Sequence, residues 1–136
     1  MEQLLCHLVG DYWLQNDWMA SNKKKDFGAA LTHSIIYTLP FVLICHSIWV
    51  LLVICITHCI IDGTYIVNKL NQIKNWDFKN HQIGYFKQRG LGILGKTSMQ
   101  LADGYSDRPL FIRIWLIIIQ DNILHLVINY LAIKYL

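Results

Sequence analysis

Residues 48–67 read IWVLLVICITHCIIDGTYIV, a stretch that contains no Lys or Arg and a single carboxylate, Asp62. A helix rises about 1.5 Å per residue, so a stretch of this length and composition matches the ~30 Å hydrocarbon core of a bilayer. His58 and Asp62 interrupt the apolar run four positions apart, and residues at this spacing lie on one face of a helix. The segment therefore predicts a transmembrane helix that points two ionisable side chains in one direction.

Three other segments resemble this one to different degrees. Residues 27–47 lie directly before it and contain Pro40, which predicts a kinked transmembrane helix joined to the next in a hairpin. Residues 110–135 form a third apolar run. Residues 3–20 have helical periodicity, but their polar side chains predict a helix packed against the others, either spanning or re-entrant.

The composition agrees with a membrane protein. Hydrophobic residues make up 54% of the chain and charged residues 15%, with a mean hydropathy of +0.34, whereas soluble domains carry about a quarter charged residues. The Lys and Arg residues concentrate in residues 23–25 and 68–109, which the positive-inside rule assigns to the cytoplasmic side. We therefore predict an all-α integral membrane bundle, one domain over residues 1–136, with 68–109 as a basic interfacial segment. Such placement does not predict a nucleic-acid surface.

His and Asp recur four positions apart more often than chance allows. With six His and eight Asp in 136 positions, chance gives roughly 0.7 such pairs. The sequence has four of them: His7/Asp11, His58/Asp62 and Asp121/His125 in predicted membrane helices, and Asp77/His81 in the polar stretch. We expect the last to be a solvated surface pair.

Convergence of the intramembrane pairs predicts a metal site, because bundle metal sites are built from side chains on facing helices. A carboxylate at mid-bilayer costs about 2.5–3.5 kcal/mol on insertion scales, and no Lys or Arg in these helices is placed to pair with all of them. A divalent cation would neutralise these carboxylates. His33 adds a ligand candidate from the remaining helix. The full set of candidates is His7, Asp11, His33, His58, Asp62, Asp121 and His125.

These seven candidates suffice for one or two ions. Mixed nitrogen and oxygen ligands without thiolate predict Zn, with Mn and Fe as alternatives. Four further residues fall on the same faces or beside the candidates, namely Gln15, Tyr37, Asn122 and Asn129. They would orient the ligands or contact a substrate, or they would simply make interhelical hydrogen bonds. A purely structural hydrogen-bond network is the plainer alternative for the whole set.

A different motif points elsewhere. Residues 90–97, GLGILGKT, match the P-loop pattern of nucleotide-binding proteins. That loop needs a buried strand before it and a helix after it, and residues 84–89 carry two charges and little strand character. We therefore expect an interfacial loop here rather than a nucleotide site.

Four stretches carry a family resemblance: HLVGDYWLQNDWMA, LTHSIIYTLPF, ITHCIIDG and GYSDRPLFIRIWLIIIQDNILHL. They resemble a family of small membrane proteins of unknown function found in bacteria and their phages. That family in turn is similar to the inner-membrane, metal-dependent hydrolases described as LexA-binding. The resemblance covers most of the chain and is weaker across residues 69–96. It implies a multi-pass protein of the bacterial inner membrane and points to the same seven ligand candidates.

Three functions follow as hypotheses. The first is a membrane-embedded metal-dependent hydrolase with Asp11 or Asp62 as general base and a lipidic or membrane-delivered substrate, such as a phospholipid or polyprenyl phosphate. The second is an ion or proton pathway, which four short helices would support only as a homo-oligomer. The third is a phage factor that interacts with the host envelope through residues 69–108.

Overall fold

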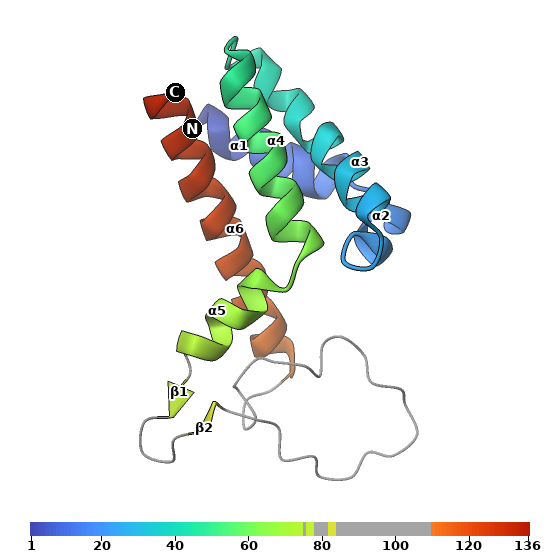
Figure 1. Ribbon diagram of the computed structural model, residues 1–136, viewed down its shortest axis with the longest axis vertical. Coiled ribbons are helices and arrows are strands. Elements are labelled where there is room, and N and C mark those ends of the chain that lie inside the picture. Colours follow the sequence, from blue (N-terminus) through green and yellow to red (C-terminus); the bar gives the residue numbers. More distant parts are fainter. Residues whose placement is uncertain (75, 78–81, 84–109) are drawn as a thin grey trace. The chain divides into compact units, whose positions relative to one another are not determined.

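The computed structural model describes residues 1–74, 76–77, 82–83 and 110–136 (Figure 1). The helices are α1 (Glu2–Leu8), the π-helical turn η1 (Val9–Trp13), α2 (Asp17–Asn22), α3 (Phe27–Thr38), the 3-10 turn η2 (Leu39–Leu43), α4 (Ile48–Gly63), α5 (Ile66–Lys74) and α6 (Leu110–Tyr135). Apart from a two-residue antiparallel ladder of β1 (Trp76–Asp77) and β2 (Gln82–Ile83), the described residues confirm the all-helical prediction. The GLGILGKT motif, His81 and most of the predicted interfacial segment lie outside the described residues.

The helices divide into two compact units. The first contains Met1–Tyr65 together with Asn122–Leu136, and the second contains Ile66–Asp121. The first unit therefore comprises α1 to α4 and the C-terminal half of α6, and it holds the candidate site. In the second unit, Val67 and Asn71 lie one turn apart on α5, and both are buried.

The N-terminal segment is not the single helix over residues 3–20 that we predicted. The N–H of Leu14 donates to the carbonyl of Val9 at 2.9 Å, five residues back, so the chain forms a π-helical turn after α1. Asn16 is then extended, and its side chain accepts from the N–H of Met19 at 2.9 Å, which caps α2. The segment therefore consists of a helix with a π turn and a second short helix that begins after Asn16.

The central hairpin also differs from two full spans over residues 27–47 and 48–67. Pro40 lacks an N–H and disfavours helical geometry at the preceding residue, so α3 gives way to the 3-10 turn η2. The second helix, α4, has 16 residues and ends at Gly63. At 1.5 Å per residue it is about 24 Å long, which is short of the ~30 Å of a bilayer core.

One helix in the described part of the chain is long and apolar enough to cross a membrane. It is Ile114–Tyr135, 22 residues within α6. The segments Phe27–Leu43 and Ile48–Gly63 are shorter apolar helices. The expectation of three clear spans is therefore corrected to one candidate span, because η2 and the end of α4 shorten the other two.

Small residues allow close packing within the first unit. A Cβ on Gly10 would lie 2.6 Å from Cδ2 of Tyr37 and 2.9 Å from its carbonyl oxygen, so η1 rests directly on the backbone of α3. A Cβ on Gly63 would lie 3.3 Å from the Cβ of Ala30, where α4 meets α3. Larger side chains at these points would push the elements that carry the candidate site apart.

The buried face of α4 changes character along its length. Val50 and Ile54, near its start, belong to an apolar core that also includes Tyr37 and Phe41. The next two positions on the same face are His58 and Asp62, and both are buried. The apolar core thus holds the first half of α4 in position, and His58 and Asp62 extend the same buried face toward the end of the helix.

Candidate metal centre

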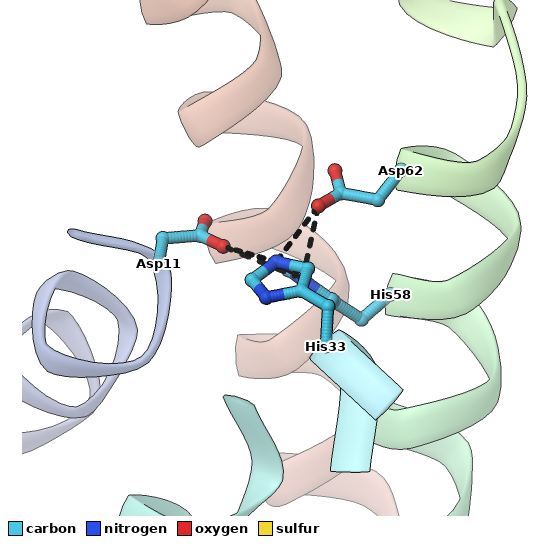
Figure 2. Close-up of side chains that lie close together, drawn as sticks. All are labelled: Asp11, His33, His58 and Asp62. Atoms are coloured by element: carbon cyan, nitrogen blue, oxygen red, sulfur yellow. Dashed lines mark hydrogen bonds and ion pairs between the residues drawn. The ribbon is translucent and has the colours of Figure 1, made fainter. Parts of the chain in front are cut away.

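Four buried ionisable side chains converge in the first unit: Asp11, His33, His58 and Asp62, called here the tetrad (Figure 2). Asp11 comes from η1, His33 from α3, and His58 and Asp62 from α4. Each residue offers one nitrogen or oxygen atom, and these atoms all lie within 4.8 Å of one another. Three separate elements of the chain therefore contribute to one polar centre.

The donor atoms of the tetrad form a compact polyhedron. The Nε2 atom of His33 lies 3.0 Å from Oδ2 of Asp62 and 3.2 Å from Oδ1 of Asp11. The Nε2 atom of His58 lies 3.3 Å from each of these oxygens and 3.0 Å from Nε2 of His33. These five distances of 3.0–3.3 Å are close to the roughly 3.3–3.6 Å between neighbouring ligand atoms of a tetrahedral zinc site with bonds of ~2.0–2.2 Å.

One atom of the tetrad provides a test of whether a cation fits. Oδ1 of Asp11 is buried and, among the described residues, accepts no hydrogen bond, although two imidazole nitrogens lie beside it. A buried carboxylate oxygen without a donor is costly. A cation bound by His33, His58 and Asp62, together with a water on that cation, would satisfy this oxygen and would account for the two close imidazole nitrogens as ligands. The residues present therefore fit a divalent metal.

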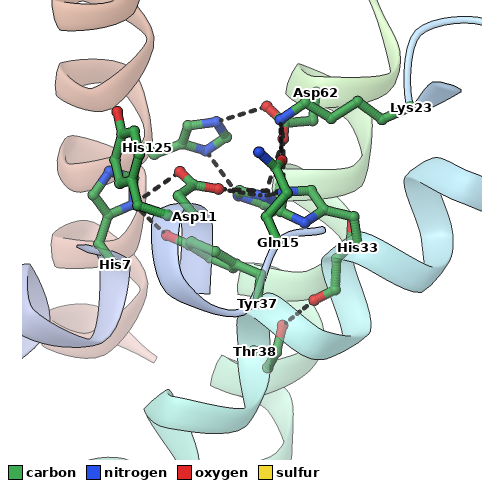
Figure 3. A network of polar contacts seen from close by, with 12 residues as sticks. His7, Asp11, Gln15, Lys23, His33, Tyr37, Thr38, Asp62 and His125 are labelled. Atoms are coloured by element: carbon green, nitrogen blue, oxygen red, sulfur yellow. Dashed lines mark hydrogen bonds and ion pairs between the residues drawn. The ribbon is translucent and has the colours of Figure 1, made fainter. Parts of the chain in front are cut away.

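His125 braces the tetrad from α6 (Figure 3). Its Nε2 atom lies 3.2 Å from Oδ1 of Asp62, and its Nδ1 atom lies 3.2 Å from Nδ1 of His58. It therefore touches the faces of Asp62 and His58 that are turned away from the tetrad's centre. Such partners fix the orientation of metal-binding side chains.

His7 is held outside the tetrad by Asn122. The Nδ2 group of Asn122 donates to the hydroxyl of Tyr12 at 2.7 Å, so its Oδ1 accepts from Nε2 of His7 at 2.6 Å. The proton of His7 is thus on Nε2, and its Nδ1 atom accepts from the hydroxyl of Tyr37 at 2.8 Å. Nδ1 of His7 also lies 3.5 Å from Oδ2 of Asp11. The predicted ligand His7 is therefore a neighbour of the site.

Tyr37 supports His58 by ring stacking. The two ring centroids are 3.5 Å apart and the planes differ by 11°. The hydroxyl of Tyr37 accepts from Nδ2 of Asn129 at 2.6 Å while it donates to His7. Tyr37, Asn122 and Asn129, which the sequence placed beside the ligands, therefore all belong to one hydrogen-bonded network around the tetrad.

Lys23 is the site residue that the sequence interpretation missed. Its Nζ atom lies 2.7 Å from Oδ2 of Asp62 and donates to Oε1 of Gln15 at 2.8 Å (Figure 3). From the sequence we place residues 23–25 in a cytoplasmic basic segment and consider counter-ions for the carboxylates only within the predicted membrane helices. Lys23 lies outside those helices, and the turn after α2 brings it to the end of α4, beside Asp62.

The seven predicted ligands thus separate into groups. Four form the tetrad, and two, His7 and His125, contact it. Asp121 lies one turn before His125 on α6 but belongs to the second unit, and it is not part of the tetrad. Of the fourth His/Asp pair, Asp77 lies in β1 and His81 lies outside the described residues.

Comparison with known proteins gives one match. A family model described as a protein of unknown function (DUF3307) matches residues 1–87, the part of the chain that contains the whole tetrad and Lys23. No curated protein and no solved structure matches the chain. The match therefore groups the chain with others without assigning a reaction to the site.

Proposed function

The chain belongs to the DUF3307 family of proteins of unknown function, and on that premise we propose that it is a membrane-embedded, metal-dependent hydrolase with a lipidic or membrane-delivered substrate. The observation that carries the proposal is the tetrad, in which two imidazoles and two carboxylates place their donor atoms about one buried point. Nitrogen and oxygen donors without thiolate suit Zn, Mn or Fe, and we take Zn as the first candidate.

Three members of the tetrad are assigned to the metal. Catalytic zinc sites use three protein ligands and keep one position open, so His33, His58 and Asp62 would hold the ion. When bound, a divalent metal supplies Lewis acidity and lowers the pKa of a coordinated water to about 7. Each oxygen of Asp62 has a partner of its own: Oδ1 lies 3.2 Å from Nε2 of His125, and Oδ2 lies 2.7 Å from Nζ of Lys23.

Asp11 is assigned as the general base. Its Oδ1 atom faces the centre of the tetrad without a hydrogen bond among the described residues, and its Oδ2 atom lies 3.5 Å from His7. Asp62, by contrast, is engaged on both oxygens. A carboxylate that is held in place but not saturated can take a proton from the attacking water and pass it to the leaving group.

The distribution of apolar side chains supports a bilayer environment. Large residues on α4 and α6, including Ile56 and Val127, are about half exposed, at 55% and 50%. The inward faces of the same helices carry His58, Asp62 and His125, which are almost fully buried. Water-soluble domains bury apolar residues and expose ionisable ones. We propose that the chain lies in the bacterial inner membrane, with Ile114–Tyr135 as its candidate span and with the apolar outer faces of α3 and α4 in contact with lipid.

Metal content is the experiment that tests this proposal. The detergent-purified chain should carry one or two Zn, Mn or Fe ions per molecule, measured by elemental analysis. His58→Ala and Asp62→Asn should lose the metal. His46→Ala and Asp17→Asn are the matched controls, because they make the same changes at exposed positions. A wild-type chain that takes up no metal after reconstitution with added ions would refute the metallohydrolase.

A proton pathway is the second candidate, and one observation favours it. Polar contacts of 3.5 Å or less run without interruption from Lys23 through Asp62, His33 and Asp11 to His7. Chains of His and Asp within a membrane are used as proton relays. Proton flux into liposomes that Asp11→Asn abolishes, in a protein that binds no metal, would favour this function over hydrolysis.

A further inference from the structure

Lys23 stands beside the proposed metal position, and this placement has a consequence for the substrate. Its Nζ atom lies 2.7 Å from Oδ2 of Asp62, the same oxygen that lies 3.0 Å from Nε2 of His33. A carboxylate oxygen has two lone pairs, so it can hold an ion on one and a Lys ammonium on the other. Two positive charges would then face the same small region.

We propose that Lys23 and the bound metal together form a binding site for a phosphate group of the substrate. The inference rests on the proposed metal centre and adds the chemical class of the substrate to it. Lys is a common phosphate-binding residue that acts as a point charge. Paired with a divalent ion, it clamps the charge that a phosphate ester develops during hydrolysis.

The positive groups of the site support an anionic ligand. The ammonium of Lys23 contacts Oδ2 of Asp62, the oxygen that also lies beside Nε2 of His33. Lys23 and a divalent ion held by His33 and Asp62 would therefore place two positive charges close together. Positive charge in a buried environment is poorly solvated and attracts an anion. A phosphate oxygen supplies that anion.

The exposure of the side chains indicates where such an anion enters. The side chain of Lys23 is 17% exposed, whereas those of Asp11 and Asp62 are 9% and 3% exposed. Lys23 is therefore the most exposed of these three charged side chains, and an arriving anion would meet it first. The neighbouring lysines lie on the same turn between α2 and α3: Lys24 stands 5.4 Å from the ring centroid of Tyr65, and Lys25 is exposed.

The backbone of Lys23 is also held in place. Its carbonyl oxygen would lie 3.8 Å from a Cβ on Gly63, so the turn after α2 packs on the last residue of α4. Gln15 fixes the ammonium from the other side at 2.8 Å. A phosphate that arrives would therefore meet a preorganised cation, which lowers the cost of binding.

The test uses the full-length chain, purified in a detergent without phosphate and loaded with zinc. Isothermal titration with inorganic phosphate measures affinity for Lys23→Gln, Lys23→Arg and the control Lys25→Gln, which removes an exposed Lys of the same turn. We expect the wild type to bind phosphate only when zinc is present. Lys23→Gln should weaken binding about tenfold or more, Lys23→Arg should retain most of it, and Lys25→Gln should match the wild type.

A lipid arm distinguishes the source of the phosphate. Dioleoyl phosphatidic acid and dioleoylglycerol, in mixed micelles with the same detergent, differ only by the phosphate group. Tighter binding of phosphatidic acid that depends on Lys23 identifies a lipid headgroup. Binding of inorganic phosphate with no preference between the two lipids identifies a soluble phosphate compound.

Zinc content, measured for every variant, separates the two possible failures. A wild type without zinc refutes the metal centre, and the phosphate site with it. A zinc-loaded wild type that ignores phosphate, or equal affinities for Lys23→Gln and Lys25→Gln, overturns the phosphate site alone. Loss of zinc from Lys23→Gln would also overturn it, because Lys23 would then serve only to hold Asp62.

Discussion

The phenol ring of Tyr37 lies parallel to the imidazole of His58, with centroids 3.5 Å apart and planes 11° apart. Because the hydroxyl of Tyr37 is held by His7 and Asn129, the ring acts as a fixed plate that sets the plane of His58. The orientation of this imidazole decides whether Nε2 faces the tetrad. Residues from α1, α3 and α6 therefore support one candidate metal ligand on α4.

Two substitutions of Tyr37 should separate its two roles. Tyr37→Phe keeps the stacked ring but leaves the buried polar atoms of His7 and Asn129 without their partner, which should cost about 1–3 kcal/mol of stability. Tyr37→Leu also removes the stack and should weaken zinc binding. Thermal melting and zinc titration measure the two effects, and Tyr130→Phe, at an exposed position, is the control. Equal zinc affinity in Tyr37→Leu and the wild type would exclude the supporting role.

The pairing of His58 with Asp62 was predictable because both residues belong to one helix, where spacing alone fixes the shared face. His33 was predictable as a member of the site for a different reason, because a His within a predicted apolar helix needs a polar partner. The structure brings Asp11 to the tetrad even though the helix predicted to carry it is broken. Its i,i+4 relation to His7 survives the π turn, with the two side chains 3.5 Å apart.

Other features were not predictable because they depend on contacts between distant parts of the chain. Lys23 and Asp62 are 39 positions apart, and nothing in a basic run indicates which of its members turns inward. His7 is kept from the tetrad by Asn122, 115 positions away. The residue type identifies a possible ligand, but the hydrogen-bond partner decides which way its lone pair points.

Gly10→Ala should destabilise the first unit. The added Cβ would lie 2.6 Å from the ring and 2.9 Å from the carbonyl oxygen of Tyr37, closer than real Cβ atoms approach, and two of its three nearest atoms belong to the backbone. We expect a loss of about 1–3 kcal/mol, typical of overpacking. Gly28→Ala is the control, because its Cβ would meet only Asp26 at 3.4 Å. Melting of both variants in the same detergent makes the comparison, and a Gly10→Ala chain as stable as Gly28→Ala would contradict the packing of η1 on α3.

Asp11→Asn and Asp62→Asn should differ in outcome. If Asp11 is the general base, Asp11→Asn retains zinc but loses hydrolysis of a phosphate-bearing lipid, typically by 10²–10⁴-fold. Asp62→Asn should lose both zinc and hydrolysis, because it removes a ligand. Zinc analysis and product release, measured on the same preparations with Asp17→Asn as control, decide between the roles. Retention of zinc by Asp62→Asn together with its loss from Asp11→Asn would reverse the two assignments.

Removal of the metal should lower the stability of the wild type. A ligand that binds only the folded state stabilises it by about 2.7 kcal/mol when its concentration is a hundred times its Kd. The melting temperature of the zinc-loaded chain should therefore fall when a chelator is added and recover with excess zinc. His58→Ala should show no such response, because it lacks a central ligand, whereas His46→Ala should respond like the wild type. His46 is a suitable control because it is exposed, whereas His58 is buried within the tetrad. An identical chelator response in His58→Ala and the wild type would place the stabilising ion outside the tetrad.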